Sequence, residues 1–221
     1  MKNTKNYFCI VLVVAVVMIC VGCSSFSDQS IVLPPTRIGT GTFQGALGER
    51  YTFESALSEA DVVARIEVGN WISEDTDIFQ TYYEATVLEC FKGSIPTSFT
   101  LLQDGCSQAT EKRYPLFTHG NELLVFLNEA TLTDYESPYW IIGSFTTVFD
   151  VFYDNGGDRY YADRYGIMGE LTNISRNYAL VENVSNVLRN KAIEEDPIIE
   201  EMQYEYPYIF SETDIMNLLA Y

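Results

Sequence analysis

The N-terminal end of the chain does most to limit what the remainder can fold into. Residues 1–7 carry Lys2 and Lys5 and no acidic residue, and residues 8–21 are almost wholly apolar. A basic start followed by an apolar segment shorter than the roughly 20 residues that span a bilayer as a helix is typical of an export signal. We therefore expect residues 1–22 to be a signal peptide that takes no part in the folded domain.

The end of this segment, Cys20-Val21-Gly22-Cys23, resembles the lipobox of signal peptidase II, with Cys20 at the position where Leu is usual. The resemblance implies cleavage before Cys23, whose sulfur carries a diacylglyceryl group. Two acyl chains hold a protein stably at a membrane. The expected location is the extracytoplasmic face of the cell membrane. The alternative is an uncleaved anchor helix over residues 8–21, which also places the remainder outside the cytoplasm.

Composition divides the remaining chain into three parts. Residues 23–49 are rich in Ser, Gly, Thr and Pro and have no hydrophobic period, which indicates a lipidated N-terminus followed by a flexible tether. Residues 50–165 are expected to form one β-domain. Residues 166–221 are expected to form a C-terminal helical extension packed on that domain.

Hydrophobic alternation predicts the strands. In residues 61–69, Val62 and Ala64 fall on the apolar side of a period of two, which is typical of a half-buried strand. A second strand changes phase at Leu88-Glu89, as a bulge or strong coiling of the strand would require. The predicted strands after the first cover residues 79–92, 97–103, 123–127, 139–149 and 159–162.

Turn and capping signals complete the prediction. The turn at residues 154–157 contains Asn and Gly and predicts an added hairpin. Residues 53–60 have helical spacing, Ser175 caps a second helical segment, and Ser211 with Asp214 begins a third in the manner of a capping box. The expected fold is mainly β, a small closed five-stranded barrel with an added hairpin and two or three flanking helices.

Three stretches carry a resemblance to a family. A helix ending in EADVVARIEV, a strand ending in VLECFKGS and the run FTHGNELLVFL are similar to motifs of secreted bacterial proteins. Residues 53–149 thereby resemble the OB-like barrel of the tissue-inhibitor-of-metalloproteinase and netrin-module group. Those inhibitors chelate zinc through a free N-terminal Cys in a C-x-C motif. Here Cys23 is expected to be acylated and Ser24-Ser25 follows it, so inhibition by that mechanism is not expected.

Charge restricts the partners. The chain has 31 acidic and 13 basic residues and a formal net charge of −18. Loss of the signal peptide removes two lysines and no acid, so the mature protein is more acidic still. Such a surface repels phosphates, so no nucleic-acid partner is expected. The partner should be neutral, cationic or apolar; alternatively, the charge serves only to keep the protein soluble.

No motif predicts catalysis or a cofactor. His119, the single histidine, lies in a predicted surface turn, and nucleophilic triads and most zinc sites need a histidine with defined partners. The acidic clusters at residues 74–77 and 150–158 lack the spacing of a calcium loop. No pair of carboxylates can be singled out for glycoside hydrolysis. We therefore expect no cofactor, no metal and no enzymatic activity.

Two cysteines remain after Cys23, namely Cys90 and Cys106. Export permits a disulfide between them. A hairpin that turns at residues 93–96 places Cys90 opposite Phe99, which leaves Cys106 roughly 23 Å farther along the strand. Two separate thiols are therefore favoured, and a disulfide would require the chain after residue 103 to fold back.

Two functional hypotheses remain. In the first, the protein is a noncatalytic, lipid-anchored binding or scaffolding module whose partner is another protein of the bacterial envelope. In the second, it binds or cleaves carbohydrate at an aromatic face formed by Tyr139, Trp140, Tyr160 and Tyr161 together with carboxylates. Exposure of these rings on one concave face would favour the second hypothesis, and their burial would favour the first.

Overall fold

The computed structural model describes residues 42–43, 51–111, 114–132, 134–154, 156–163 and 208–220. The predicted signal peptide, Cys23 and the helical segment expected after Ser175 lie outside this part of the chain. Within it, no helix is long and apolar enough to cross a membrane.

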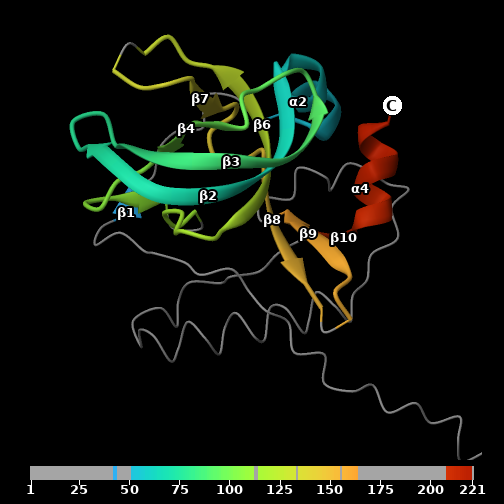
Figure 1. The fold of residues 1–221 in the computed structure, drawn as a ribbon. Helices are drawn as coiled ribbons and strands as arrows, with labels where there is room; N and C mark the ends of the chain where they lie inside the picture. The colour runs from blue at the N-terminus through green and yellow to red at the C-terminus, as the bar shows by residue number, and fades with distance from the viewer. Residues whose placement is uncertain are drawn as a thin grey trace, which may run out of the picture. The chain divides into compact units, whose positions relative to one another are not determined.

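Five strands close into a barrel (Figure 1). Strand β2 pairs with β3, β3 with β4, β4 with β7, β7 with β6, and β6 returns to β2. All these pairs are antiparallel except β4–β7, which is parallel. The closed five-stranded barrel and the mainly β architecture are thus confirmed. The barrel strands are β2 (Val62–Asp75), β3 (Gln80–Lys92), β4 (Ser98–Asp104), β6 (Glu122–Glu129) and β7 (Pro138–Ile141).

Three further strands extend the sheet from the barrel, β8 (Val148–Tyr153), β9 (Arg159–Asp163) and β10 (Tyr208–Ser211). They pair antiparallel in the order β6-β8-β9-β10. The predicted hairpin is β8–β9, whereas β10 was not expected. A short parallel pair joins β1 (Thr42–Phe43) to β5 (Thr110–Glu111).

The prediction of one strand over residues 139–149 is wrong. β7 ends at Ile141 and β8 begins at Val148, and Gly143 and Ser144 between them have φ values of 63° and 60°. These left-handed residues turn the chain. β7 therefore closes the barrel, whereas β8 pairs with β6 and continues the sheet outward.

Of the two explanations expected for the phase change in the second strand, the structure shows the bulge. Arg65 of β2 lies opposite Glu89, and the next residue, Ile66, lies opposite Val87, so Leu88 is the extra residue of β3. A bulge increases the local bend and twist of a strand. It helps the long β2–β3 ribbon to coil around the barrel (Figure 1).

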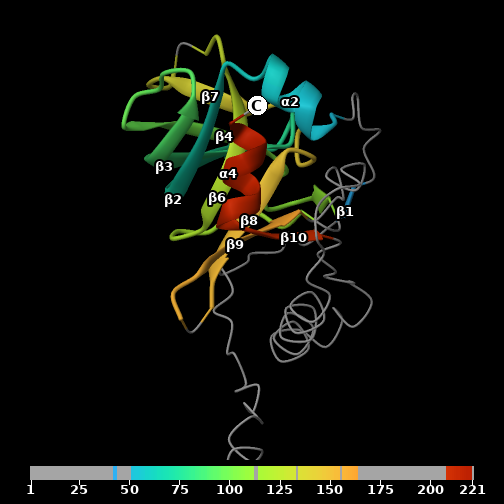
Figure 2. The same ribbon diagram turned by 90° about the vertical axis from the view of Figure 1, so that its right-hand side faces the viewer.

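The structure describes two helices, α2 (Phe53–Glu59) and α4 (Glu212–Leu219), both predicted. Each begins with a capping box, formed by Thr52 and Ser55 in α2 and by Ser211 and Asp214 in α4. These side chains satisfy backbone N–H groups that have no partner within the helix. α4 directly follows β10 and packs against β9 and β10 (Figure 2).

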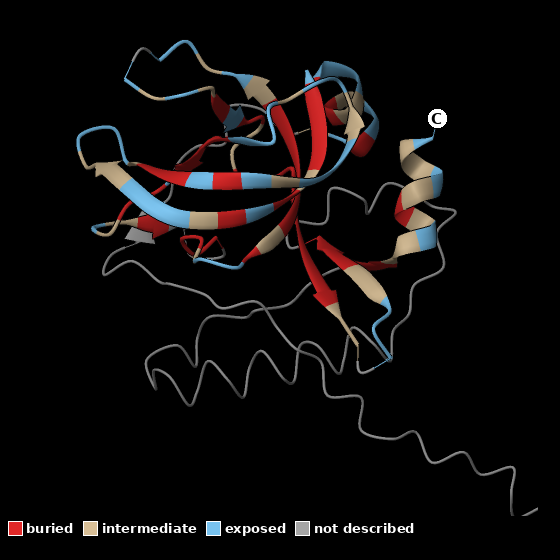
Figure 3. Ribbon diagram, viewed as in Figure 1, coloured by how far each residue is buried: buried red, intermediate tan, exposed pale blue. Residues whose placement is uncertain are grey.

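The buried side chains form two clusters on opposite sides of the barrel wall. Figure 3 shows how buried residues are distributed along the strands and helices. Ile66, Leu101 and Val125 lie in the barrel interior. Outside it, Phe126 of β6 packs edge-on against Phe53 of α2, with ring centroids 5.4 Å apart. Because both faces of β6 are covered, its sequence is a continuous apolar run rather than an alternating one.

Candidate binding pocket

Three side chains in register cross the outer face of β3, β4 and β7. Tyr82 of β3 pairs with Leu102 of β4, and Leu102 pairs with Trp140 of β7. Their sequence neighbours Tyr83 and Leu101 belong to the barrel interior. Since successive side chains of a strand point to opposite faces, the row lies on the outside of the barrel.

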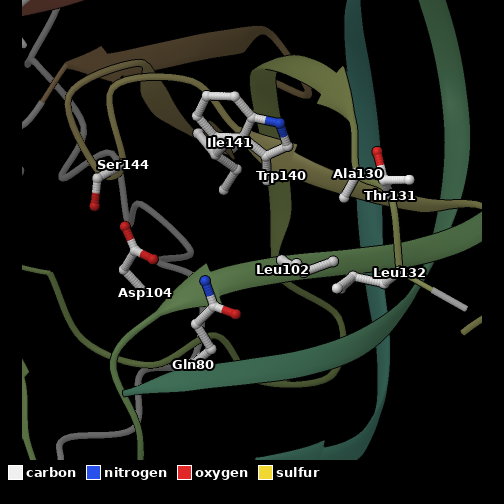
Figure 4. Close-up of a pocket in the computed structure, with 9 residues that line it drawn as sticks. All are labelled: Gln80, Leu102, Asp104, Ala130, Thr131, Leu132, Trp140, Ile141 and Ser144. Carbon is white, nitrogen blue, oxygen red and sulfur yellow. The ribbon is translucent and has the colours of Figure 1, made fainter. Parts of the chain in front are cut away.

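A cavity of about 240 Å³ opens on this face beside the indole of Trp140 (Figure 4). We call it the Trp140 pocket. It combines side chains from the starts and ends of three barrel strands with the segment that follows β6. Its walls are formed by Gln80, Leu102, Asp104, Ala130, Thr131, Leu132, Trp140, Ile141 and Ser144.

The two aromatic ends of the row differ in how they are covered. Tyr135, from the segment between β6 and β7, stacks on Tyr82 with ring centroids 4.3 Å apart and an interplanar angle of 10°. Its hydroxyl oxygen lies 2.9 Å from Ser73 Oγ, which holds the ring in place. Trp140 is 41% exposed, and no ring in the described part of the chain stacks on it. The row therefore has one closed end and one open end.

The segment at residues 130–137, which supplies one wall, is tied to the barrel at both ends. The backbone N–H of Ala130 donates to Pro138 O at 2.8 Å, and that of Thr100 donates to Ser137 O at 3.2 Å. Ser137 has a φ of 42°, which turns the chain into β7. The wall is thus positioned by barrel strands on either side of it.

The pocket is polar at one end and apolar at the other (Figure 4). Gln80, Asp104 and Ser144 lie at the polar end, whereas Leu102 and Leu132 lie at the apolar end. The carboxylate of Asp104 makes no hydrogen bond or ion pair with any residue that the structure describes, and the residue is exposed. This group is therefore available to a ligand.

Neighbouring groups orient Gln80. The hydroxyl of Tyr82 donates to Gln80 Oε1 at 3.1 Å, which leaves the amide nitrogen for another partner. In Figure 4 this nitrogen points toward the side of the pocket that holds Trp140. Burial, with further contributions from Tyr135 and Asp75, raises the pKa of Tyr82, so its hydroxyl stays protonated as the donor at neutral pH.

Of the two predicted aromatic residues on β7, only Trp140 faces the pocket. Tyr139 is 6% exposed and packs edge-on against Phe99 inside the barrel, with ring centroids 5.4 Å apart. Burial, followed by Glu129 and Asp61, raises the pKa of the Tyr139 hydroxyl. Adjacent residues of a strand cannot both face outward, so the pair does not form one platform.

The other two predicted aromatic residues lie on β9, outside the five-stranded barrel. Tyr161 is fully buried in the outer cluster, and Tyr160 is half-buried and stacks on Phe152 with ring centroids 5.7 Å apart. Burial is the largest cause of the raised pKa of both hydroxyls. The expected single aromatic face of Tyr139, Trp140, Tyr160 and Tyr161 is therefore not formed.

The two cysteines after Cys23 are free thiols, Cys90 exposed and Cys106 buried, so the structure contains no disulfide between them. The expected pairing of Cys90 with Phe99 is wrong. Phe99 pairs with Ala85, and the end of β3 that carries Cys90 pairs with β2 instead. The register of β3 with β4 thus separates Cys90 and Cys106 by more residues along the strands than the expected hairpin would.

His119 is exposed in the turn before β6, as expected. In the two acidic loops, carboxylates accept hydrogen bonds from backbone N–H groups of the same loop. Asp75 Oδ1 accepts from the backbone N–H two residues farther along the chain at 2.9 Å, and Asp154 Oδ1 accepts from two nearby backbone N–H groups at 2.9 Å each. In the described part of the chain, no three His, Cys, Asp or Glu residues are grouped so that they could hold a metal.

A second polar group lies between the barrel and the added strands. Arg65 contacts Glu122 and, at 3.5 Å, Glu89, while Arg159 contacts Glu212 and, at 3.9 Å, the same Glu89. We call these five residues the ion cluster. Both guanidinium groups are occupied by carboxylates within the protein, so the ion cluster joins α4 and β9 to the barrel.

The sequence pattern did not identify the residues that accompany Trp140. The period of two in β3 and β4 was a sufficient signal to place Gln80, Leu102 and Asp104 on the outer face. It carried no information on which strands are neighbours in the barrel, and therefore none on which outer-face residues lie next to one another. Leu132 and Ser144 lie in connecting segments without a period, so only the closed barrel shows that they share a pocket.

The sequence of this chain matches no known protein family and no curated protein, so the pocket must be interpreted from its own geometry.

Proposed function

We propose that this chain is a lipid-anchored, noncatalytic binding module on the extracytoplasmic face of a bacterial cell membrane, and that its partner is another envelope protein. The observation that carries the proposal is the Trp140 pocket, an open cavity on the barrel with a half-exposed indole and a carboxylate that pairs with no described residue. Pockets of this kind, apolar with a few placed polar groups, are typical binding sites.

We further propose that the barrel is OB-like. Numbered along the barrel, its strands follow the closed order 1-2-3-5-4, with strands 3 and 5 parallel. OB-folds bind ligands on the face of strands 2 and 3 and through the loop between strands 4 and 5. These correspond to β3, β4 and residues 130–137, which form the Trp140 pocket. This support is an analogy between folds.

The noncatalytic assignment is supported by how the polar groups are engaged. The carboxylates of the ion cluster bind arginines, and Glu74 binds Ser107 through both the backbone N–H and the hydroxyl. Among the described residues that line the Trp140 pocket, Asp104 is accompanied by no histidine and no second acid. A general acid–base pair needs two groups with separate protonation states near one reacting atom.

Site-specific photo-crosslinking in the native envelope tests the location of the binding surface. A photoreactive residue at Thr131, which is exposed on the pocket wall, should capture an envelope protein. The same residue at Ser94, exposed in the β3–β4 connection, should capture none. Equal capture at both positions, or capture at Ser94 alone, would contradict the proposed surface.

Mass spectrometry of the processed protein tests the anchor. We expect a polypeptide that begins at a diacylglyceryl-modified Cys23, and a Cys23→Ala variant that keeps its signal peptide. An unmodified Cys23, or residues 1–22 still attached to the wild-type protein, would contradict lipid anchoring while leaving the pocket untouched.

Carbohydrate binding is the second candidate, and Trp140 favours it. An exposed indole beside a carboxylate and an amide can stack on a sugar ring and bind its hydroxyls. Against it, the other three aromatic residues that we expected on the face lie elsewhere, two of them buried. The burial of these rings favours a protein partner.

A further inference from the structure

We propose that the Trp140 pocket binds the side chain of a lysine or arginine on a basic segment of the partner protein. The inference rests on the proposed function and names the chemistry that its binding site recognises. It follows from the polarity of the cavity, from its carboxylate, which pairs with no described residue, and from the net charge of the chain.

The cavity matches a long side chain with a cationic head. Leu102 and Leu132 form its apolar end, where the aliphatic stem of Lys or Arg can be buried. Asp104 lies at the other end, where the charged head would be placed. The exposed indole of Trp140 borders both ends, and an aromatic face attracts a cation as well as an aliphatic chain.

The polar end offers groups for a peptide as well as for a cation. Asp104 can accept hydrogen bonds from an ammonium or a guanidinium group, and it has no described partner within the protein. The free amide nitrogen of Gln80 is a donor, because its oxygen is engaged by Tyr82. This donor suits a backbone carbonyl of the bound segment, so one ligand residue can satisfy both groups.

Charge complementarity favours a basic partner. The chain has 31 acidic and 13 basic residues. In the region that the structure describes, the cations are Arg65, Lys92 and Arg159, and all three bind groups of the protein away from the pocket. Within the described region, no unengaged cation near Asp104 therefore repels a basic segment. The negative net charge of the protein accelerates the approach of such a segment.

The test uses Trp140 as its own reporter. The chain has two tryptophans, so a Trp71→Phe background leaves Trp140 as the single source of tryptophan emission. The full processed lipoprotein, in a neutral detergent, is titrated with the peptide acetyl-Ala-Ala-Lys-Ala-Ala-amide. The counterparts with Arg and with norleucine at the central position are titrated in parallel. Norleucine keeps the aliphatic stem of lysine and removes its charge.

We expect a saturable change in emission with the Lys and Arg peptides and binding that is at least about tenfold weaker with norleucine. Asp104→Asn should weaken binding of the Lys peptide by about tenfold. Asp158→Asn, a matched change in the exposed β8–β9 turn, should leave it unchanged. Added salt should weaken binding to the wild type more than to Asp104→Asn.

Equal affinity for the Lys and norleucine peptides, or equal effects of the two Asp→Asn variants, would overturn the inference. A change in Trp140 emission with chitotriose and none with the peptides would also overturn it, while supporting a binding module for sugars. If no probe binds although Thr131 crosslinks an envelope protein, the ligand class proposed here is wrong and the proposed function stands.

Discussion

At the scale of single residues, Lys92-Gly93 shows why a short motif can be required by the fold. Gly93 ends β3 with a φ of 79°, and a Cβ atom there would lie 2.1 Å from the carbonyl oxygen of Asp61. The backbone that enters β2 therefore passes directly over it. A side chain is excluded both by the left-handed conformation and by this close approach.

The Gly93→Ala variant should lose more than about 2 kcal/mol of unfolding free energy, because the methyl group adds a backbone clash to the left-handed strain. Gly157→Ala is a matched control, since φ there is 85° and nothing lies within 4 Å of the added Cβ. It should lose only about 1 kcal/mol. Urea unfolding of both variants measures the difference, and equal losses would show that the contact with Asp61 is unimportant.

Phe79 is a bulky residue in the left-handed region, with a φ of 53° and a ring that is 42% exposed. Because Gly tolerates this conformation and Ala does not, Phe79→Gly should be more stable than Phe79→Ala by about 1 kcal/mol. Both variants lose the ring, so their difference reports the backbone alone. At the neighbouring Ile78, whose φ is not positive, the order of Gly and Ala should be reversed.

At the scale of elements, α2 has its C-terminal end held by a strand distant in sequence. Lys92 Nζ donates to the carbonyl oxygens of Leu57, Ser58 and Ala60 at 2.6, 3.0 and 2.6 Å. These are carbonyls at and just beyond the last turn of the helix, where an ammonium group also opposes the negative end of the helix dipole. The helix is thus fastened to the end of β3.

Replacing Lys92 by Met keeps the aliphatic stem and removes the three donors, so we expect a loss of about 2 kcal/mol of unfolding free energy. Backbone amides of α2 should exchange with solvent faster, whereas those of α4, which ends far from Lys92 in the chain, should keep their protection. Hydrogen exchange measured by mass spectrometry separates these segments. Unchanged exchange in α2 would show that the helix does not depend on this cap.

At the scale of the whole molecule, five tyrosines link stability to alkaline pH. Burial is the first cause of a raised pKa in each of them, namely Tyr82, Tyr139, Tyr153, Tyr160 and Tyr161. Above pH 10, the ordinary pKa of tyrosine, these tyrosines ionise in the unfolded chain but stay neutral in the folded one. The unfolded state then binds fewer protons, so stability falls as the pH rises through the folded pKa values.

These tyrosines should leave the midpoint of urea unfolding unchanged below pH 10 and should lower it above pH 10. Spectroscopic titration of the folded protein should show one group of tyrosines ionising near the ordinary pKa and a second group ionising later. Titration of all tyrosines in a single step near pH 10, with the fold intact, would contradict the effect of burial.

Much of the fold was predictable because it depends on neighbours in sequence. The helix at residues 53–60, the capping box of Ser211, the β8–β9 turn and the bulge at Leu88 are all confirmed. The strand expected over residues 139–149 was wrong because both of its halves are apolar. The alternation of apolar and polar residues cannot show that the chain turns between the two halves, or that the second half takes a different place in the sheet.

The site was less predictable than the fold. Trp140 was named beforehand, but with Tyr139, Tyr160 and Tyr161, which face other parts of the molecule. Composition suggested an aromatic face without deciding which rings share it. Register decides this, since Leu102 lies between Tyr82 and Trp140 through pairings that join distant parts of the chain.

The sequence by itself determined the local matters: the presence of most strands and of both described helices, which side of a half-buried strand is apolar, and the acidic character of the chain. Closure of the barrel decided that β4 and β7 lie side by side, and with them Asp104, Trp140 and the segment between β6 and β7. The physical reason is that side-chain period and capping act over a few residues. Strand pairing instead depends on contacts between segments far apart in the chain.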